Sequence, residues 1–210
     1  TEENEFAGII ASEAGNLERI LRSVLSYSRE ARLVLEPKDM NEIVEECLRT
    51  FGEMIATNGI AVKKNFADLP QVMIDGFQVK EALNNFILNA IEAMREGGGV
   101  LSLSTRKEEF HEIPYLILEI ADTGSGIPEN KAAMIFEPFF TTKTLGRGTG
   151  LGLPISKKIV EDHGGFICFD SQEGRGTAFR LHFPFGGSSM GDAGNKEREV
   201  HCTIRTIPGA

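Results

Sequence analysis

Hydrophobic residues recur every three or four positions over residues 1–32, which predicts one long helix. A helix of this kind cannot bury its apolar stripe alone, so it needs a partner surface. Two alternatives remain open: the helix packs on its own domain, or it belongs to a helical bundle or coiled coil. The stripe contains Phe6, Ile10, Leu17, Ile20, Val24, Tyr27 and Ala31.

From residue 39 onward, segments with helical and strand periods are mixed. Helices are predicted from Asp39, from Asp75 to the glycines at 97–99, after Pro128, and from Leu151 to the sequence HGG. This order predicts an α+β fold: a two-layer α/β sandwich, with one mixed, mostly antiparallel sheet and helices on one face. The predicted strands are residues 59–66, 71–74, 100–106, 115–121, 165–171 and 177–183.

Two prolines and a loss of periodicity mark the expected boundaries. Pro37 cannot continue a helix, so a connector is expected there, and Pro114 is expected in a charged loop between two strands. After Phe185 the apolar pattern ends, which indicates a disordered tail or linker. We therefore expect three parts: a helix over 1–32, a domain over 33–185 and a tail over 186–210.

The helix that begins at Asp75 carries two asparagines, Asn85 and Asn89, one turn apart on the same side. The bland interpretation is a solvated helix face. Asparagine is a poor helix former, however, so this repetition indicates a function. An amide oxygen is a suitable Mg²⁺ ligand, and Mg²⁺ takes one or two protein ligands in addition to substrate phosphates. The opposite side is predicted to be buried through Val79, Ala82, Leu83, Phe86, Ile87, Ala90, Ile91 and Met94.

Two glycine-rich segments are candidate nucleotide loops. The sequence ADTGSGIP at 121–128 follows a strand, although D-x-G-x-G alone is also common in turns. The sequence GRGTGLGL at 146–153 leads into a helix, whose N-terminus favours an anion. A mobile loop is the alternative for the second segment, and it is not a P-loop because G-x-x-x-x-G-K-[ST] does not occur.

Composition narrows the function classes. The formal net charge of −9 and the lack of a long basic run argue against nucleic-acid binding. No apolar stretch reaches the roughly 20 residues of a membrane span. The three cysteines lack metal-binding spacing. We therefore expect a cytoplasmic segment that contacts neither nucleic acid nor membrane, although a longer parent protein could be anchored elsewhere.

Five motifs occur in a fixed order, and together they resemble the ATP-binding domain of sensor histidine kinases, in the superfamily of gyrase, Hsp90 and MutL. NNFILNAIEAM is similar to the N box, DTGSGIP to the G1 box, FEPFFTTK to the F box, GRGTGLGL to the G2 box, and GRGT to the last glycine box. The resemblance covers roughly residues 39–185. The opening helix resembles the second helix of the dimerisation and phosphotransfer hairpin. The residues NAIEAM and FFTTK within the boxes are most similar to the nitrogen-regulatory subgroup.

The resemblance implies a Bergerat-type fold and an adenine pocket. Asp122 would accept a hydrogen bond from the adenine amine, which selects adenine over guanine. Gly124, Gly126 and Ile127 would lie beside the base, and Thr177 would support the pocket through a water.

It also implies a site for Mg²⁺ and the phosphates. Asn89 would bind Mg²⁺, and Asn85 would act catalytically beside the metal and phosphates. Lys143 and Arg147 are the candidate catalytic cations over the γ-phosphate. The phosphate cradle would contain Gly146, Gly148, Gly150, Leu151 and Gly152.

The acceptor histidine of such a kinase is not evident in this chain. Among the four histidines, only His111 precedes an acid, and Pro114 follows too closely for a helix. The parent protein is therefore expected to be a homodimeric autokinase that passes phosphate from a histidine hairpin to an aspartate on a response regulator. This chain is expected to bind ATP and ADP without phosphorylating itself, and to act on a hairpin supplied in trans.

Three other functions remain alternatives. One is a regulatory module switched by nucleotide without useful turnover. Another is an ATPase of the gyrase or Hsp90 type, with Glu81 as the base that activates water. The last is a protein kinase of the mitochondrial dehydrogenase type, which shares the fold.

Overall fold

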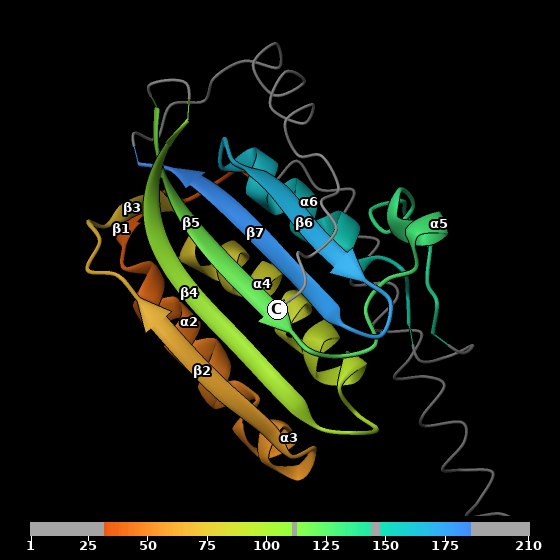
Figure 1. The fold of residues 1–210 in the computed structure, drawn as a ribbon. Helices are drawn as coiled ribbons and strands as arrows, with labels where there is room; N and C mark the ends of the chain where they lie inside the picture. The colour runs from red at the N-terminus through yellow and green to blue at the C-terminus, as the bar shows by residue number, and fades with distance from the viewer. Residues whose placement is uncertain (1–31, 111–112, 144–147, 186–210) are drawn as a thin grey trace, which may run out of the picture.

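The structure is a computed structural model that describes residues 32–110, 113–143 and 148–185 (Figure 1). Its main sheet has five strands in the order β2-β4-β5-β7-β6, and β1 and β3 form a separate two-stranded sheet. Only the β2–β4 pair is parallel within the main sheet, so the expected mixed, mostly antiparallel sheet is confirmed. The strands are β1 Glu36–Lys38, β2 Ile60–Phe66, β3 Val72–Ile74, β4 Gly99–Phe110, β5 Ile113–Asp122, β6 Phe166–Gln172 and β7 Gly176–Pro184.

The helices form a second layer on one face of the sheet, as the sequence predicted (Figure 1). α4 and α6 lie side by side behind the central strands, and α2 lies behind β2 and β4. The short helix α3 was not predicted as a separate element. The helices are α2 Met40–Thr50, α3 Gly52–Thr57, α4 Gly76–Ala93, α5 Glu129–Ala132 and α6 Gly152–Asp162. The long helix predicted over 1–32 and the tail predicted over 186–210 lie outside the described residues, apart from Arg32.

Two aspartates begin the helices at the positions expected from the sequence. The Asp39 side chain accepts a hydrogen bond from the Asn41 N–H at 2.7 Å, at the start of α2. The Asp75 side chain accepts bonds from the Phe77 and Gln78 N–H groups, both at 3.1 Å, at the start of α4. Each cap satisfies helix donors that have no partner within the helix.

The hydrophobic core lies between the two layers. All eight residues predicted for the buried side of α4 are buried. Seven of them pack with strand residues such as Leu103, Leu118 and Leu181, and Ala82 packs with residues of α6. The aromatic rings of Phe86 and Phe179 meet across this interface, with centroids 4.9 Å apart. The apolar residues that recur every three or four positions on the helix therefore share one core with the alternating apolar residues of the strands.

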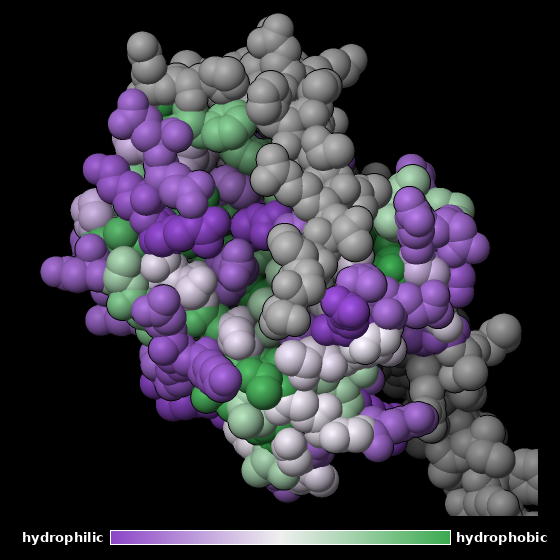
Figure 2. All heavy atoms as spheres, viewed as in Figure 1, coloured by the Kyte–Doolittle hydropathy of each residue, from purple (hydrophilic) through white to green (hydrophobic). Residues whose placement is uncertain are grey.

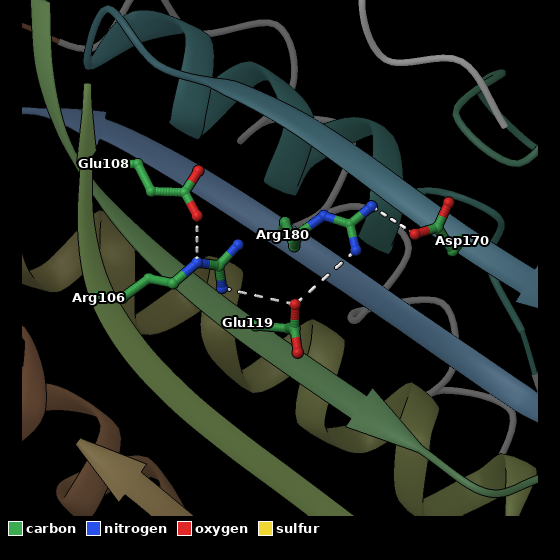
Figure 3. Close-up of polar contacts among 5 residues, drawn as sticks. All are labelled: Arg106, Glu108, Glu119, Asp170 and Arg180. Carbon is green, nitrogen blue, oxygen red and sulfur yellow. Dashed lines mark hydrogen bonds and ion pairs between the residues drawn. The ribbon is translucent and has the colours of Figure 1, made fainter. Parts of the chain in front are cut away.

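The opposite face of the sheet carries a row of charged side chains from four strands (Figure 3). Glu119 of β5 lies between Arg106 of β4, at 3.5 Å, and Arg180 of β7, at 3.7 Å. Arg180 continues the row to Asp170 of β6 at 2.5 Å, and Arg106 also pairs with Glu108. Hydrophilic side chains cover much of this face (Figure 2). Opposite charges on neighbouring strands favour this register of the sheet.

Both prolines expected to interrupt the chain lie instead in strands. Pro37 is the middle residue of β1, opposite Met73. Pro114 belongs to β5, opposite Glu109, so the predicted charged loop was wrong over residues 107–110 and 113–114. Proline lacks a donor but keeps its carbonyl, and the Pro114 carbonyl accepts a bond from the Phe185 N–H at 3.1 Å. A proline near the start of a strand is therefore compatible with pairing.

Candidate functional site

The first part of the site, called the base end here, lies where β5 and β7 pair. Asp122 is the last residue of β5 and stands opposite Thr177. The Asp122 carboxylate accepts a hydrogen bond from the Gly124 N–H at 2.8 Å and another from the Thr177 N–H. Burial raises the pKa of Asp122 to about 6, although these two donors favour the charged form. The site thus holds a largely desolvated carboxylate with remaining capacity to accept hydrogen bonds.

Ser171 connects three segments of the base end and was not singled out from the sequence. Its hydroxyl accepts a bond from the Ile127 N–H at 2.8 Å and lies 2.9 Å from the Thr177 hydroxyl. It also lies 3.1 Å from the Gly176 carbonyl. The strand pattern of residues 165–171 predicted only that Ser171 lies in a strand. Its partners lie in β7 and in the loop after β5, and no local pattern identifies them.

The loop after Asp122 packs tightly on the end of α4. The Ser125 N–H donates to the Ala93 carbonyl at 3.1 Å. A Cβ on Gly124 would lie 2.6 Å from that same carbonyl oxygen. Gly126 has φ +66°, and a Cβ there would lie 2.0 Å from the Gln172 carbonyl oxygen. These two glycines are required for the close approach of the loop to α4 and β6.

The second part of the site, called the phosphate end, lies where α4 meets the start of α6. The Asn85 side-chain amide donates to the Gly152 carbonyl at 3.3 Å and to the Ser156 hydroxyl at 3.1 Å. Ser156 is fully buried and also bonds the Gly152 carbonyl at 2.9 Å. Leu151, directly before α6, is buried as well, with 1% of its surface exposed. Ser156 was missed because helix periodicity predicts its burial but not its partner.

Asn89 and Glu92 both face Lys143, which follows the aromatic FEPFF stretch. The Lys143 ammonium donates to Asn89 Oδ1 at 2.9 Å and forms an ion pair with the Glu92 carboxylate. The side chains of Lys143 and Glu92 are each 35% exposed. Asn89 therefore presents its amide oxygen to a cation, as a Mg²⁺ ligand must. The Asn89 amide oxygen and the Glu92 carboxylate are ligand types that Mg²⁺ takes, and the Lys143 ammonium lies against both.

The F box and the G2 box lie against each other at the phosphate end. The Phe139 N–H donates to the Gly150 carbonyl at 2.9 Å, and Phe139 has φ 68°, unusual for a residue with a side chain. A Cβ on Gly150 would lie 2.4 Å from the Phe139 carbonyl carbon. A Cβ on Gly148 would lie 2.5 Å from the Thr141 hydroxyl.

Most of the predicted site residues are thus brought together from distant parts of the chain. Two of them, Gly146 and Arg147, lie outside the described residues. Glu81 is partly buried on α4, one turn before Asn85. Among the described residues, no helix is long and apolar enough to cross a membrane.

Comparison with known proteins identifies the same region. Residues 74–187 match the model of a family described as "Histidine kinase-, DNA gyrase B-, and HSP90-like ATPase". The chain is 36% identical over 187 residues to sensor kinase CckA of Brucella abortus, which covers 83% of this chain and 20% of CckA. It is 32% identical to sporulation kinase C of Bacillus subtilis over 88% of this chain and 42% of that kinase. The chain therefore spans less than half the length of these curated relatives.

Solved structures show the same architecture. The catalytic domain of histidine kinase ThkA is 33% identical with a TM-score of 0.62, over 72% of this chain and 95% of that domain. A structure of ThkA in complex with the response regulator TrrA is 31% identical with a TM-score of 0.71, over 89% of this chain and 52% of the ThkA chain. These matches favour a sensor kinase domain over the nucleotide-switch and gyrase-type alternatives.

Proposed function

Because the chain belongs to the histidine kinase-, DNA gyrase B- and HSP90-like ATPase family and carries the ATP-binding catalytic domain of a sensor histidine kinase, we propose that it binds Mg-ATP and transfers the γ-phosphate to a histidine of an acceptor hairpin. The observation that carries this proposal is that one helix, α4, contacts both ends of the site: Asn85 bonds Gly152 and Ser156 of α6, and Ala93 bonds the loop that follows Asp122. The Ser125–Ala93 contact anchors that loop on the last residue of α4, two turns beyond Asn85 and one turn beyond Asn89.

At the base end, Asp122 recognises adenine. Its carboxylate accepts a hydrogen bond from the exocyclic amine, a donor that guanine lacks at that position. Gly124, Gly126 and Ile127 keep the loop beside the base, and their packing on α4 and Ser171 supports this role. Thr177 supports the pocket from β7 through a water. Recognition depends on a buried acceptor whose partner must be a donor.

At the phosphate end, Asn89 contributes its amide oxygen to Mg²⁺, which neutralises phosphate charge when bound. Asn85 fixes the start of α6, where Gly148, Gly150, Leu151 and Gly152 hold the phosphates with backbone N–H groups. The lysine now paired with Asn89, Lys143, is a candidate cation for the γ-phosphate. Gly146 and Arg147 are assigned to the cradle and the γ-phosphate by resemblance. Transfer then depends on positioning and charge neutralisation rather than covalent catalysis.

The proposal extends to the protein from which the chain derives. Residues 1–32 act as the second helix of a dimerisation hairpin, residues 33–185 as the catalytic domain, and residues 186–210 as a tail or linker. The acceptor hairpin belongs to a homodimeric parent, and the phosphorylated histidine passes its phosphate to a response-regulator aspartate. The catalytic domain works in the cytoplasm and contacts neither nucleic acid nor membrane.

A mixing experiment tests this proposal. The chain is incubated with γ-labelled ATP, with and without Mg²⁺, in the presence of a separately produced acceptor hairpin. We expect acid-labile label on the hairpin and none on this chain. The reaction is expected to be slow, because separate chains at micromolar concentration lack the roughly millimolar effective concentration of a tethered hairpin.

Two results would contradict the proposal. Label on this chain in the absence of a hairpin would show that an acceptor lies within it. Failure of the chain to bind ATP in a calorimetric titration would exclude the nucleotide site itself. Asp122→Asn serves as the matched negative control in both experiments.

A further inference from the structure

A buried hydrogen-bonded group joins the start of α4 to the end of α6, away from the nucleotide residues. The Asp75 N–H donates to His163 Nε2 at 2.9 Å, across 88 positions of the sequence. Because Nε2 accepts this bond, the ring proton lies on Nδ1, which donates to the Ile159 carbonyl at 2.7 Å. Asp75 and His163 are 9% and 8% exposed. The imidazole therefore fixes the end of its own helix and the start of the other.

The Asp75 carboxylate also holds the chain as it enters the domain. Oδ2 accepts a hydrogen bond from the Val34 N–H at 3.1 Å. Oδ1 meanwhile caps α4 through the Phe77 and Gln78 N–H groups. Val34 lies just before β1 and shortly after residues 1–32, where the long helix is predicted. One buried carboxylate thus contacts both the entering segment and the first turn of α4.

The two helices are joined a second time at the phosphate end. There the Asn85 amide bonds the Gly152 carbonyl and the Ser156 hydroxyl, so α4 and α6 run antiparallel. Between the two junctions, Ala82 of α4 packs in a buried cluster with α6 residues. Close-packed helices move as units, so displacement of one junction changes the geometry of the other.

We infer that Asp75 and His163 are positioning residues that tie the entering segment to α4 and α6 and thereby set the placement of Asn85 against Gly152. Val34, Asp75 and His163 are called the entry node below. The inference rests on the proposed ATP site, because nucleotide affinity is its first readout. It identifies the entry node as the path by which the segment before residue 34 influences nucleotide binding, and by which nucleotide influences that segment.

The first test compares His163→Gln with His163→Asn by calorimetric titration of Mg-ATP. The glutamine amide oxygen reaches the position of Nε2 and accepts the Asp75 N–H, whereas the shorter asparagine leaves that N–H without a partner. We expect His163→Gln to bind Mg-ATP within about twofold of the wild-type chain. We expect His163→Asn to bind about three- to thirtyfold more weakly, the range found for mutations that modulate coupling between sites.

A loss of stability alone must be separated from a positioning effect. Ile117 is buried on the opposite face of the sheet, in the cluster with Tyr115 and Phe166. Ile117→Val and Ile117→Ala lower the free energy of unfolding by a small and a large amount, chosen so that the loss in His163→Asn lies between them. We expect both controls to bind Mg-ATP like the wild-type chain at a temperature where all are folded. Weakened binding in controls of equal stability would overturn the inference.

The second test follows the entering segment itself. Asparagine caps helices as well as aspartate does, so Asp75→Asn keeps the α4 cap and the backbone donor to His163. Its side-chain nitrogen cannot accept the Val34 N–H, so that bond is lost together with the long one, at 3.5 Å, that the Gln78 side chain donates to the same oxygen. In the wild-type chain, Mg-ATP is expected to slow amide hydrogen exchange at Val34 about fivefold or more. This protection is expected to be lost in Asp75→Asn.

The outcomes distinguish the inference from the proposed function. No ATP binding by the wild-type chain would reject the proposed function and with it the nucleotide readout of the inference. Normal binding by the wild-type chain, with equal affinities for His163→Asn and His163→Gln, would reject the inference alone. Val34 exchange that does not respond to Mg-ATP in the wild-type chain would also reject it.

Discussion

The base end and the phosphate end of the site are built on different supports. At the base end, Asp122 is fixed by the register of β5 and β7, and its contacts are backbone N–H groups. At the phosphate end, Asn89 extends from a helix face and contacts the end of a flexible side chain, Lys143. Backbone donors in a sheet are pre-organised, whereas a half-exposed lysine is easily redirected.

This difference assigns separate tasks to the two ends. A pre-organised acceptor suits recognition of a constant group, the adenine amine. The contact of Asn89 with the Lys143 ammonium can be replaced, which suits a position where Mg²⁺ and phosphate groups bind and leave during turnover. The two ends should therefore respond differently to substitution, pH and metal.

The largest effect is expected from Asp122→Asn. Its amide can place a donor against the adenine amine, and leaving buried groups unpaired should weaken ATP binding by about 1–3 kcal/mol. The loss should be the same with and without Mg²⁺, because the metal is bound at the other end. Paired calorimetric titrations measure both values. Unchanged affinity would remove Asp122 from the base end.

The same substitution should stabilise the free domain. The difference between the ordinary Asp pKa of 3.8 and about 6 corresponds to roughly 2–3 kcal/mol. Because the pKa of Asp122 is raised in the folded state, its protonated form adds this amount to the free energy of unfolding below pH 3.8. The contribution is lost as the pH rises through about 6. At pH 7 Asp122→Asn should therefore raise Tm by roughly 4–12 °C, measured by calorimetry without nucleotide. A lower Tm would contradict this electrostatic cost.

At the phosphate end, Asn89→Ala should abolish most of the gain in ATP affinity that Mg²⁺ provides. Loss of a metal ligand or its support typically lowers metal affinity tenfold or more. Affinity without Mg²⁺ should change little, which distinguishes this variant from Asp122→Asn. Titration of Mg²⁺ into the chain with ATP measures the effect. Equal Mg²⁺ dependence in the variant and the wild-type chain would place the metal elsewhere.

The pH dependence of ATP affinity should arise from protonation of Asp122 at the base end. Protonation of Asp122 removes an acceptor, and with a pKa of about 6 the affinity at pH 5 should be about tenfold lower than at pH 7. The phosphates of ATP titrate in this range as well, so Asp122→Asn is the reference. The difference between the two pH profiles isolates Asp122. Parallel profiles would show that its protonation does not control binding.

The smallest effect is expected from Lys143→Gln. The pair with Glu92 is half-exposed, and exposed ion pairs contribute less than about 1 kcal/mol. If Lys143 turns to the γ-phosphate, the variant should weaken ATP binding by up to about fivefold and leave ADP binding unchanged. Lys158→Gln, which removes a lysine paired with Asp162 on α6, is the matched control. Equal effects on ATP and ADP would show that Lys143 only contacts Asn89 and Glu92 and does not bind the γ-phosphate.

Local patterns predicted those features that depend on neighbours along the chain. The 3.6-residue period identified every buried position on α4, and Asp75 was recognised as its N-cap because an aspartate precedes an apolar period. The glycines at 124 and 126 were identified by their motif. The resemblance to sensor kinases supplied the roles, which spacing alone left open.

Tertiary structure determined the partners. The bond of His163 to Asp75, the contacts of Ser156 and Ser171, and the pairing of Lys143 with Glu92 all join residues of separate elements. The strands that contain Pro37 and Pro114 likewise depend on pairing across the sheet. Periodicity reports which side of an element is buried, because burial follows from the apolar pattern alone. It does not report what lies opposite, because that depends on how distant elements pack.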